Sequence, residues 1–392
     1  MRTLAGLMLA LTMAAGCTNG SDPEPSTTDA PLPVTWREAA LPQPPGRSGR
    51  IAVRDAVTCG GQQHITGAVF FDDGSSKPAA WRSEDGRVWT PLTFKPRTYW
   101  GHRAVIYSAS CRDGQLALLG AKSGGAHGNP RVTTWYPRDD GVFVDVDARF
   151  ELYGGPRAVS VERMAAGETG WMIAGNRMSG AAVWISGDAR DFTLVDSDPQ
   201  LSSDPEVDTA ARDVVHADGV WTVVGNAALD GRVARVPMSW TSADGRVWTR
   251  QRMPTGDGYT DAQRVIAFRA GVYAMGLLDD AFAAWRRTGA DGKWRRAARF
   301  GGVDPDGRAS PFVSGLTRAG DGLVAAVSDQ TRYQLWASPD GKGWRPVKTP
   351  TRPTTAGEHL MTATGVGEQV ILLADDGKAG RAWIAEKINF RS

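Results

Sequence analysis

Short apolar runs, separated by turn residues, recur along almost the whole chain from residue 34 onward. Each run is four to eight residues long, is rich in β-branched and aromatic residues, and is bounded by Gly, Asp or Pro. Such runs predict β-strands, whereas the 3.6-residue periodicity of an amphipathic helix is missing throughout. The sequence therefore predicts an all-β protein.

A tryptophan marks the same position in a unit of about fifty residues. The unit is clearest in WRSEDGRVWT, WTSADGRVWT and WASPDGKGWR, which begin at Trp81, Trp240 and Trp336. The marker recurs at Trp81, Trp135, Trp184, Trp240, Trp285, Trp336 and Trp383. A glycine recurs in the apolar run before five of these markers, at Gly67, Gly120, Gly175, Gly225 and Gly276. Each unit holds four short strands, with the marker on the third and a second aromatic on the fourth, so we expect seven β-propeller blades.

The two ends of the chain predict how the ring closes. The last unit lacks a fourth strand, while residues 34–42 (VTWREAALP) resemble the fourth strands RVWTPLTF and GWRPVKTP. We therefore expect the N-terminal strand to join the last blade, so that no sheet edge is left open. A single propeller over residues 34–392 follows, and we expect it to be monomeric.

The hairpins after the marker resemble the Asp-box repeat of bacterial neuraminidases. Asp accepts backbone N–H bonds in the hairpin, Gly supplies a positive φ, and the aromatic packs between blades. The well-formed copies are Ser83/Asp85/Gly86/Trp89, Ser242/Asp244/Gly245/Trp248 and Ser338/Asp340/Gly341/Trp344. Degraded copies lie at Asp140/Gly141/Phe143, Asp188/Phe192 and Asp291/Gly292/Trp294.

The resemblance implies a structural role for these hairpins, on the face opposite the ligand site. It also implies that a sialidase would carry an arginine triad, a nucleophilic Tyr with a Glu partner, and a Tyr/Phe-Arg-Ile-Pro stretch near the first blade. Residues 49–55 read GRIAVRD instead, without the aromatic or the proline. The chain is thus most similar to the non-catalytic members of the sialidase-like propeller superfamily.

The N-terminus predicts export and lipid anchoring. Residues 1–16 combine a positive end with a thirteen-residue apolar core, which is typical of a signal peptide. The run Ala14-Ala15-Gly16-Cys17 resembles a bacterial lipobox, in which Cys17 would be acylated; the alternative is a plain secretory signal with an incidental Cys. Residues 17–33 are rich in Pro, Ser, Thr and acidic residues, so we expect a disordered tether. This places the protein on the extracytoplasmic face of the cell membrane.

Cys59 and Cys111 occupy equivalent positions in adjacent units, where the first strand turns into the second. Outside the cytoplasm an even pair of cysteines favours a disulfide, and blades converge towards the channel. We therefore predict that Cys59 and Cys111 pair.

Ligand-binding candidates lie on the loops that join one blade to the next. Residues 94–103 (FKPRTYWGHR) present Tyr99 and Trp100, which suit sugar stacking or a protein contact. Arginines also recur near the first strand of five units, at Arg50 or Arg54, Arg103, Arg157, Arg212 and Arg264. The arginines either form an anion site at the channel mouth or pair with neighbours such as Asp55, Glu162 and Asp213.

Composition limits the kinds of ligand that the chain is expected to bind. Lys plus Arg is 45 and Asp plus Glu is 43, giving a net charge of +2 with no basic excess for nucleic acid. Five scattered histidines show no metal-ligand spacing, and we expect no cofactor and no metal. The acidic loop at residues 196–208 is either solvated or a calcium site.

Three functions remain open. The sequence favours a non-catalytic binding or scaffold module for an envelope or extracellular ligand, such as an anionic glycan. The alternatives are a sialidase-like glycoside hydrolase and an assembly factor for another envelope protein.

Overall fold

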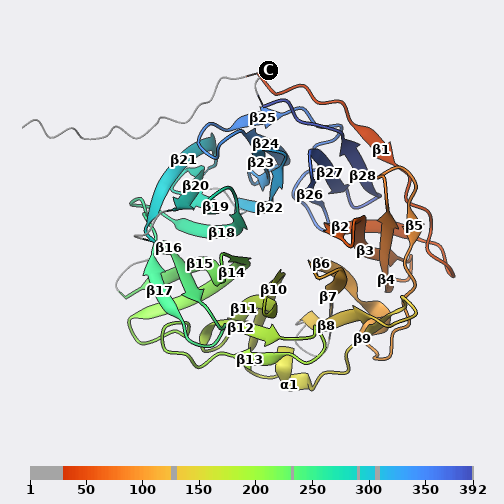
Figure 1. The fold of residues 1–392 in the computed structure, drawn as a ribbon, viewed down its shortest axis with the longest axis horizontal. Coiled ribbons are helices and arrows are strands. Elements are labelled where there is room, and N and C mark those ends of the chain that lie inside the picture. Colours follow the sequence, from red (N-terminus) through yellow and green to blue (C-terminus); the bar gives the residue numbers. More distant parts are fainter. Residues whose placement is uncertain (1–29, 125–129, 231–233, 289–291, 305–309, 391–392) are drawn as a thin grey trace, which may run out of the picture.

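Seven four-stranded antiparallel sheets form a closed ring around a central channel (Figure 1). This computed structural model describes residues 30–124, 130–230, 234–288, 292–304 and 310–390. The seven-bladed propeller predicted from the tryptophan repeat is confirmed, with one blade for each marker. The predicted signal peptide and Cys17 lie outside the described residues.

Blades 1 to 4 follow one another along the chain. Blade 1 comprises β2 (Arg50–Cys59), β3 (Gln62–Phe70), β4 (Ser76–Ser83) and β5 (Thr90–Pro91). Blade 2 comprises β6 (Val105–Arg112), β7 (Gln115–Ser123), β8 (Pro130–Pro137) and β9 (Phe143–Asp145). Blade 3 comprises β10 (Ala158–Gly167), β11 (Gly170–Arg177), β12 (Gly180–Ser186) and β13 (Thr193–Val195). Blade 4 comprises β14 (Val207–Ala217), β15 (Val220–Leu229), β16 (Arg235–Ser242) and β17 (Thr249–Arg252).

Blades 5 to 7 complete the ring. Blade 5 comprises β18 (Thr260–Ala267), β19 (Val272–Leu278), β20 (Ala281–Arg287) and β21 (Trp294–Gly302). Blade 6 comprises β22 (Phe312–Ala319), β23 (Gly322–Ser328), β24 (Tyr333–Ser338) and β25 (Arg345–Val347). Blade 7 comprises β26 (Leu360–Val366), β27 (Gln369–Asp375), β28 (Gly380–Ala385) and β1 (Arg37–Ala39). Two short helical turns, η1 (Gly101–Arg103) and α1 (Phe150–Tyr153), lie in the loops that flank blade 2.

The N-terminal strand closes the ring as predicted. β1 pairs antiparallel with β28, and Glu38 lies opposite Trp383 (Figure 1). The propeller core also includes a residue before 34, because Leu32 is buried between blades 6 and 7 and bridges Val347 of β25. The propeller therefore extends to Leu32. None of the helices in the described residues is long and apolar enough to cross a membrane.

A β-bulge interrupts six of the seven innermost strands. Each bulge adds one residue to its strand, and β10 contains two bulges; the added residue turns side chains towards the channel. The residues without a paired residue across the ladder are Arg54, Tyr107, Val159, Glu162 with Arg163, Arg212, Gln263 and Ser314. These bulges explain the recurring glycine. A Cβ at Gly67 would overlap the carbonyl oxygen of Ala52, just before the bulge, and Gly225 and Gly276 are equally crowded.

The marker tryptophans are buried on the third strands, between neighbouring blades. Apolar side chains of one blade pack there against those of the next, and seven such clusters follow one another around the ring in the described residues. The propeller core is thus a ring of apolar layers between blades rather than a single central core.

The three well-formed Asp-box hairpins share one hydrogen-bond pattern. In each, the Asp carboxylate accepts the backbone N–H groups two and three residues later; these residues are Asp85, Asp244 and Asp340. The Ser hydroxyl accepts the glycine N–H, and the glycine φ is +71° to +80°; the pairs are Ser83 with Gly86, Ser242 with Gly245, and Ser338 with Gly341. Asp188 accepts the same two backbone N–H groups although Ala189 stands in the glycine position with φ +61°, and the Ser186 hydroxyl there accepts the N–H of Asp188.

Packing against the preceding blade adds a second reason for the glycines of the Asp-box. A Cβ at Gly86, Gly245 or Gly341 would come within 2.5–2.8 Å of a side chain of that blade; these side chains are Ile384, Met172 and Tyr273, respectively. The sequence indicated only the need for a positive φ. Each hairpin tip therefore rests directly on the neighbouring blade, which ties the blades together as the Asp-box resemblance implied.

The predicted place of the second aromatic on the fourth strand was wrong for four of the six copies. Phe143 and Trp294 begin their fourth strands, whereas the other four precede theirs by one residue: Trp89, Phe192, Trp248 and Trp344. In these four hairpins the Asp carboxylate accepts the two backbone N–H groups just before the aromatic, and the ladder with the third strand begins after the aromatic. In blade 2, Asp140 accepts only the N–H of Val142, and the ladder begins at Phe143.

The aromatic still packs between blades, as predicted. Trp89, Trp248 and Trp344 are at most 5% exposed and lie in apolar clusters that span two blades. The indole N–H groups of Trp89 and Trp344 donate to the carbonyl oxygens of Gly86 and Gly341. The indole N–H of Trp248 differs, because it has no partner within the described residues.

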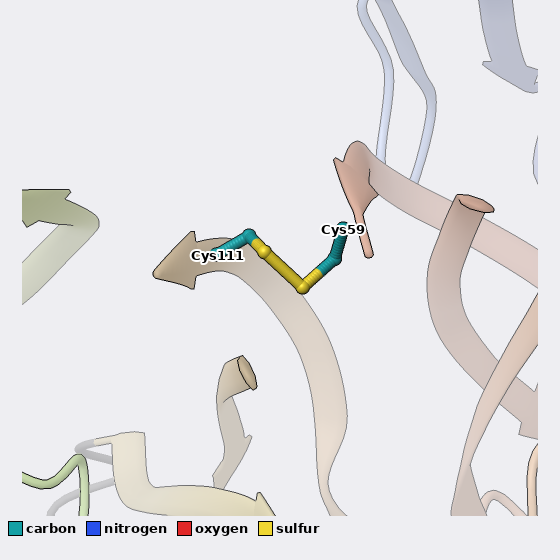
Figure 2. The surroundings of a disulfide bond; sticks show 2 residues. All are labelled: Cys59 and Cys111. Carbon is teal, nitrogen blue, oxygen red and sulfur yellow. A yellow bond between two sulfur atoms is a disulfide. The ribbon is translucent and has the colours of Figure 1, made fainter. Parts of the chain in front are cut away.

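Cys59 and Cys111 are joined by a disulfide, with their Cα atoms 5.3 Å apart (Figure 2). Cys59 ends β2 and Cys111 lies near the end of β6, so the bond links blades 1 and 2. It lies on the face that also carries the Asp-box hairpins, which we term the back face. The opposite face carries the connections between blades and is termed the front face.

Candidate functional site

The front face holds a cavity of about 700 Å³ beside the channel, between blades 5 and 6. We term it the blade 5–6 cavity. Its channel wall comes from the innermost strands β10, β14 and β18, and its rim comes from the loops of blades 5 and 6. Its apolar lining is Leu277, Val303, Pro311, Phe312 and Val313. An apolar wall with a few converging polar groups is typical of a ligand site.

Arg212 dominates the polar part of the channel wall. Its guanidinium lies 3.7 Å from a Glu162 carboxylate oxygen and 3.7 Å from a carboxylate oxygen of Asp261. Its side chain is 38% exposed, whereas Asp261 is only 1% exposed. Asp261 also accepts a hydrogen bond from the Asn226 amide. The two carboxylates therefore flank one arginine and compensate its charge.

Tyr259 approaches the same carboxylate. Its hydroxyl donates to Asp261 Oδ2 at 3.4 Å. Burial, followed by the charge of Asp261, raises the pKa of Tyr259 to about 12. A nucleophilic tyrosine needs the opposite shift, because its phenolate must be accessible near neutral pH. Tyr259 is thus a neutral hydrogen-bonding group in this cavity.

The rim of the cavity is acidic. Asp279, at φ +57°, accepts the backbone N–H of Gly258, and Asp280 forms an ion pair with Arg299. The lining residues themselves carry five carboxylates and two guanidiniums, a formal charge of 2 − 5 = −3, and Arg299, which lies outside the lining, offsets the charge of Asp280. The charged lining residues are Glu162, Asp261, Asp279, Asp280, Asp304, Arg212 and Arg264.

Buried charges also meet across the channel. Arg163 of blade 3 donates to Asp55 of blade 1 at 3.1 Å, past the intervening blade 2. Arg264 donates to the backbone oxygens of Gln263 and Ser314. Burial and the nearby charge of Arg163 lower the pKa of Arg264 to about 10, so it stays cationic at neutral pH. These contacts tie blades 1, 3, 5 and 6 together through the channel.

The structure separates the predicted arginines. Arg50 and Arg54 both bind the buried carboxylate of Asp375, at 2.8 and 2.7 Å. Arg103 stacks on Tyr99, and Arg157 is largely exposed, 3.7 Å from Asp196. Only Arg212 and Arg264 line the blade 5–6 cavity among the described residues. The six candidates thus have internal partners and do not converge on one point.

Counting back from the recurring glycine identifies the channel residues better than counting from the start of the strand. Arg54 and Arg212 lie 13 residues before Gly67 and Gly225 (67 − 54, 225 − 212), and Arg264 lies 12 before Gly276 (276 − 264). Arg163 lies 12 before Gly175 (175 − 163) and was missed from the sequence in favour of Arg157. Tyr259, Asp261 and Phe312 were also missed, because the sequence does not show which loops meet.

The Asp-box residues do not contribute to the blade 5–6 cavity. They lie on the back face, and none of the twelve lines that cavity: Ser83, Asp85, Gly86, Trp89, Ser242, Asp244, Gly245, Trp248, Ser338, Asp340, Gly341 and Trp344. Asp244 lines a smaller cavity of about 250 Å³ between the hairpins of blades 3 and 4. The side chains of the Asp-box thus serve the hairpins and the contacts between blades.

Tyr99 and Trp100 lie on the front face, in the connection between blades 1 and 2. They are therefore not next to the cavity between blades 5 and 6. Their loop is held by the buried carboxylate of Asp145, which accepts the backbone N–H groups of Arg97 and Thr98. Tyr99 is 62% exposed and packs edge-on against Trp100, with ring centroids 4.9 Å apart. The loop therefore presents a fixed aromatic surface.

The acidic loop at residues 196–208 uses its carboxylates internally. Asp198 and Asp204 accept backbone N–H groups of their own turns. Asp204 and Asp208 also pair with Arg250 and Arg235. Within the part of the chain that the structure describes, no group of three or more His, Cys, Asp or Glu residues is arranged to hold a metal ion.

Comparison with solved structures supports the fold. The chain is similar to the β-propeller domain of the Trilobed protease from Pyrococcus furiosus (TM-score 0.50, 10% identity, 86% of this chain and 94% of that one). That domain is described as having an open velcro topology, whereas β1 closes the present ring. The extracellular domain of a protein described as a one-component system from B. thetaiotaomicron is also similar (TM-score 0.52, 11% identity, covering 89% of this chain and 40% of that one).

Trypanosoma rangeli sialidase is a more distant structural match (TM-score 0.44, 12% identity, 89% of this chain). The present chain spans 57% of the length of that sialidase. No protein-family model and no curated protein matches the sequence. At these identities the likeness shows the propeller fold alone.

Proposed function

We propose that this chain is a lipid-anchored, extracytoplasmic binding module that takes a polar ligand into the blade 5–6 cavity without transforming it. The observation that carries the proposal is the cavity itself, which combines an apolar wall with converging polar groups on the front face. The Cys59–Cys111 disulfide supports a location outside the reducing cytoplasm. Cys17, directly after the apolar leader, supports the lipid anchor.

The charge of the lining favours an uncharged or cationic ligand at this cavity. Its formal charge is −3, and Arg212 is already flanked by Glu162 and Asp261. An acidic polymer would have to displace those carboxylates and approach the acidic rim. A neutral or amine-bearing glycan meets neither obstacle.

A glycoside hydrolase is the second candidate, because Glu162 and Asp261 place two carboxylates on either side of Arg212 in one cavity. Three features weigh against it. Asp261 is buried and already hydrogen-bonded, the pKa of Tyr259 is raised, and two arginines, Arg212 and Arg264, line the cavity where a sialidase-like site would need three.

The test is calorimetry with three oligosaccharides of equal length: chitotetraose, its fully de-N-acetylated form, and tetragalacturonate. We expect the neutral or the cationic tetramer to bind, and Phe312→Ala, which shortens the apolar wall, to weaken that binding several-fold. Mass spectrometry of the same mixtures should show intact sugar. Cleavage products that disappear in Glu162→Gln would establish the hydrolase instead, and no effect of Phe312→Ala would exclude this cavity.

A further inference from the structure

The front face between blades 2 and 3 has a second cavity, of about 260 Å³, with an aromatic and basic lining. Trp100, Phe150 and Tyr153 supply its rings, Arg131 and Arg149 its two cations, and Asp147 one carboxylate. Phe150 is 54% exposed, which is unusual for a large aromatic side chain on a four-residue helical turn. We term this place the blade 2–3 site.

Arg131 has aromatic supports but no acceptor. Its guanidinium carbon lies 4.6 Å from the ring centroid of Phe150 and 5.8 Å from that of Trp100. Its buried Nε has no hydrogen-bond partner, and no ion pair involves its side chain within the described residues. Leaving this one buried Nε–H donor unpaired costs free energy. Arg50, Arg54 and Arg163 differ, because each donates to a buried carboxylate.

The rings around Arg131 are held rigidly. Thr98, two residues before Trp100, donates through both its N–H and its hydroxyl to the buried Asp145. The Trp100 ring packs so closely on Gly124 that a Cβ there would overlap it. On the other side, Trp184 donates its indole N–H to the carbonyl of Leu152 and so fixes α1. The site is therefore formed before any ligand arrives, which lowers the entropy cost of binding.

We propose that the blade 2–3 site binds a sugar ring that carries an anionic group, with Arg131 as the anchor for that group. Arginine pairs with carboxylate or phosphate through two parallel hydrogen bonds, and aromatic rings pack against the apolar faces of sugars. The cavity is smaller than sites for drug-sized ligands and suits a single ring. The site is independent of the blade 5–6 cavity.

A neighbouring cavity of about 280 Å³ extends the site. It shares Pro130, Val132 and Tyr153 with the first cavity and continues towards Tyr107 near the channel. A second ring can therefore follow the first along the front face. This arrangement suits a unit within an acidic glycan as well as a free monosaccharide.

The test is calorimetry or saturation-transfer NMR with glucuronic acid, glucose 6-phosphate and glucose, followed by a galacturonate oligomer. We expect one or both anionic sugars to bind at least about tenfold more tightly than glucose, because a hydrogen-bonded charge pair is lost with glucose. Arg131→Gln should reduce binding of the anionic sugar to the level of glucose. Preference between glucuronic acid and glucose 6-phosphate identifies carboxylate or phosphate, and tighter binding of the oligomer identifies a polymer.

Arg190→Gln is the matched control, because Arg190 stacks on Tyr136 at 4.3 Å in a back-face hairpin of blade 3. That variant should bind like the unmodified protein. Phe150→Ala is a second variant that leaves Arg131 in place and should also weaken binding. Equal binding of all three sugars, or equal effects of the Arg131 and Arg190 substitutions, would overturn the proposal.

Discussion

At the scale of single residues, the bulges of the innermost strands decide which side chains reach the channel. In blades 1, 4 and 5 a carbonyl oxygen just before the bulge lies against the recurring glycine of the next strand, and that contact leaves no room for a methyl group. The glycine is therefore the residue from which channel positions should be counted.

Gly67→Ala should lower the free energy of unfolding by several kcal/mol, because its Cβ would overlap the backbone of β2 and force the strands apart (about 2–4 kcal/mol). Gly187→Ala is the control, since nothing lies within 4 Å of a Cβ there. Urea unfolding of both variants measures the difference. Similar stabilities would contradict the crowding argument.

The pKa values of the Asp-box carboxylates predict that the free energy of unfolding falls at acid pH. Backbone N–H bonds hold the pKa of Asp85 and Asp244 below 3.8, and the N–H groups of Asp191 and Arg190 outweigh desolvation to lower that of Asp188. Because these folded-state pKa values are lowered, their stabilisation is complete above about pH 3.8 and is lost as the pH falls through the lower values.

The triple variant D85N/D188N/D244N should therefore lose less stability on acidification than the unmodified protein. Thermal denaturation between about pH 6 and pH 2 measures both slopes. If the melting temperatures of the two proteins fall in parallel, these carboxylates contribute nothing specific to the loss of stability at acid pH.

At the scale of elements, most of the fold was predictable because the pattern that carries it is local. A tryptophan on the third strand of each unit and a glycine on the second strand of most units indicated seven blades. A lone strand-like segment at residues 34–42 predicted the closure by β1. Leu32 was not predictable. It lies in a Pro-rich stretch that reads as a tether, and its partner Val347 lies far along the chain.

The disulfide links two neighbouring elements, β2 and β6, and closes a loop of 52 residues. In the chain-entropy model such a loop stabilises by about 4 kcal/mol, by restricting the unfolded chain. The double variant C59S/C111S should lose about that much in denaturant unfolding. A loss below about 1 kcal/mol, or two titratable thiols in the unfolded, unreduced protein, would contradict the assignment.

At the scale of the whole molecule, the candidate sites were less predictable than the fold. Arg212 and Arg264 could be found from their spacing, but the blade 5–6 cavity needs loops from two blades to meet. Arg131 carries no sequence signal, because its significance lies in Trp100 and Phe150 from two other segments and in a buried Nε that has no acceptor among the described residues.

The proposed lipid anchor concerns the whole molecule, because it would determine where the front face meets its ligands. Cys17→Ser should leave the protein unlipidated. The native protein should partition into the detergent phase of a cloud-point extraction and the variant into the aqueous phase. Equal partition of the two would contradict the lipid anchor.

The most direct test of the central claim is whether the acidic rim of the blade 5–6 cavity sets ligand preference. Asp279→Asn removes one negative charge yet keeps an acceptor for the Gly258 N–H and tolerates φ +57°. Asp218→Asn is the matched control, because Asp218 has φ +51° in a back-face turn. Calorimetry with fully de-N-acetylated chitotetraose should show several-fold weaker binding for Asp279→Asn and no change for Asp218→Asn. Equal effects of the two substitutions, or no binding of either chitotetraose or its de-N-acetylated form to the unmodified protein, would contradict the account.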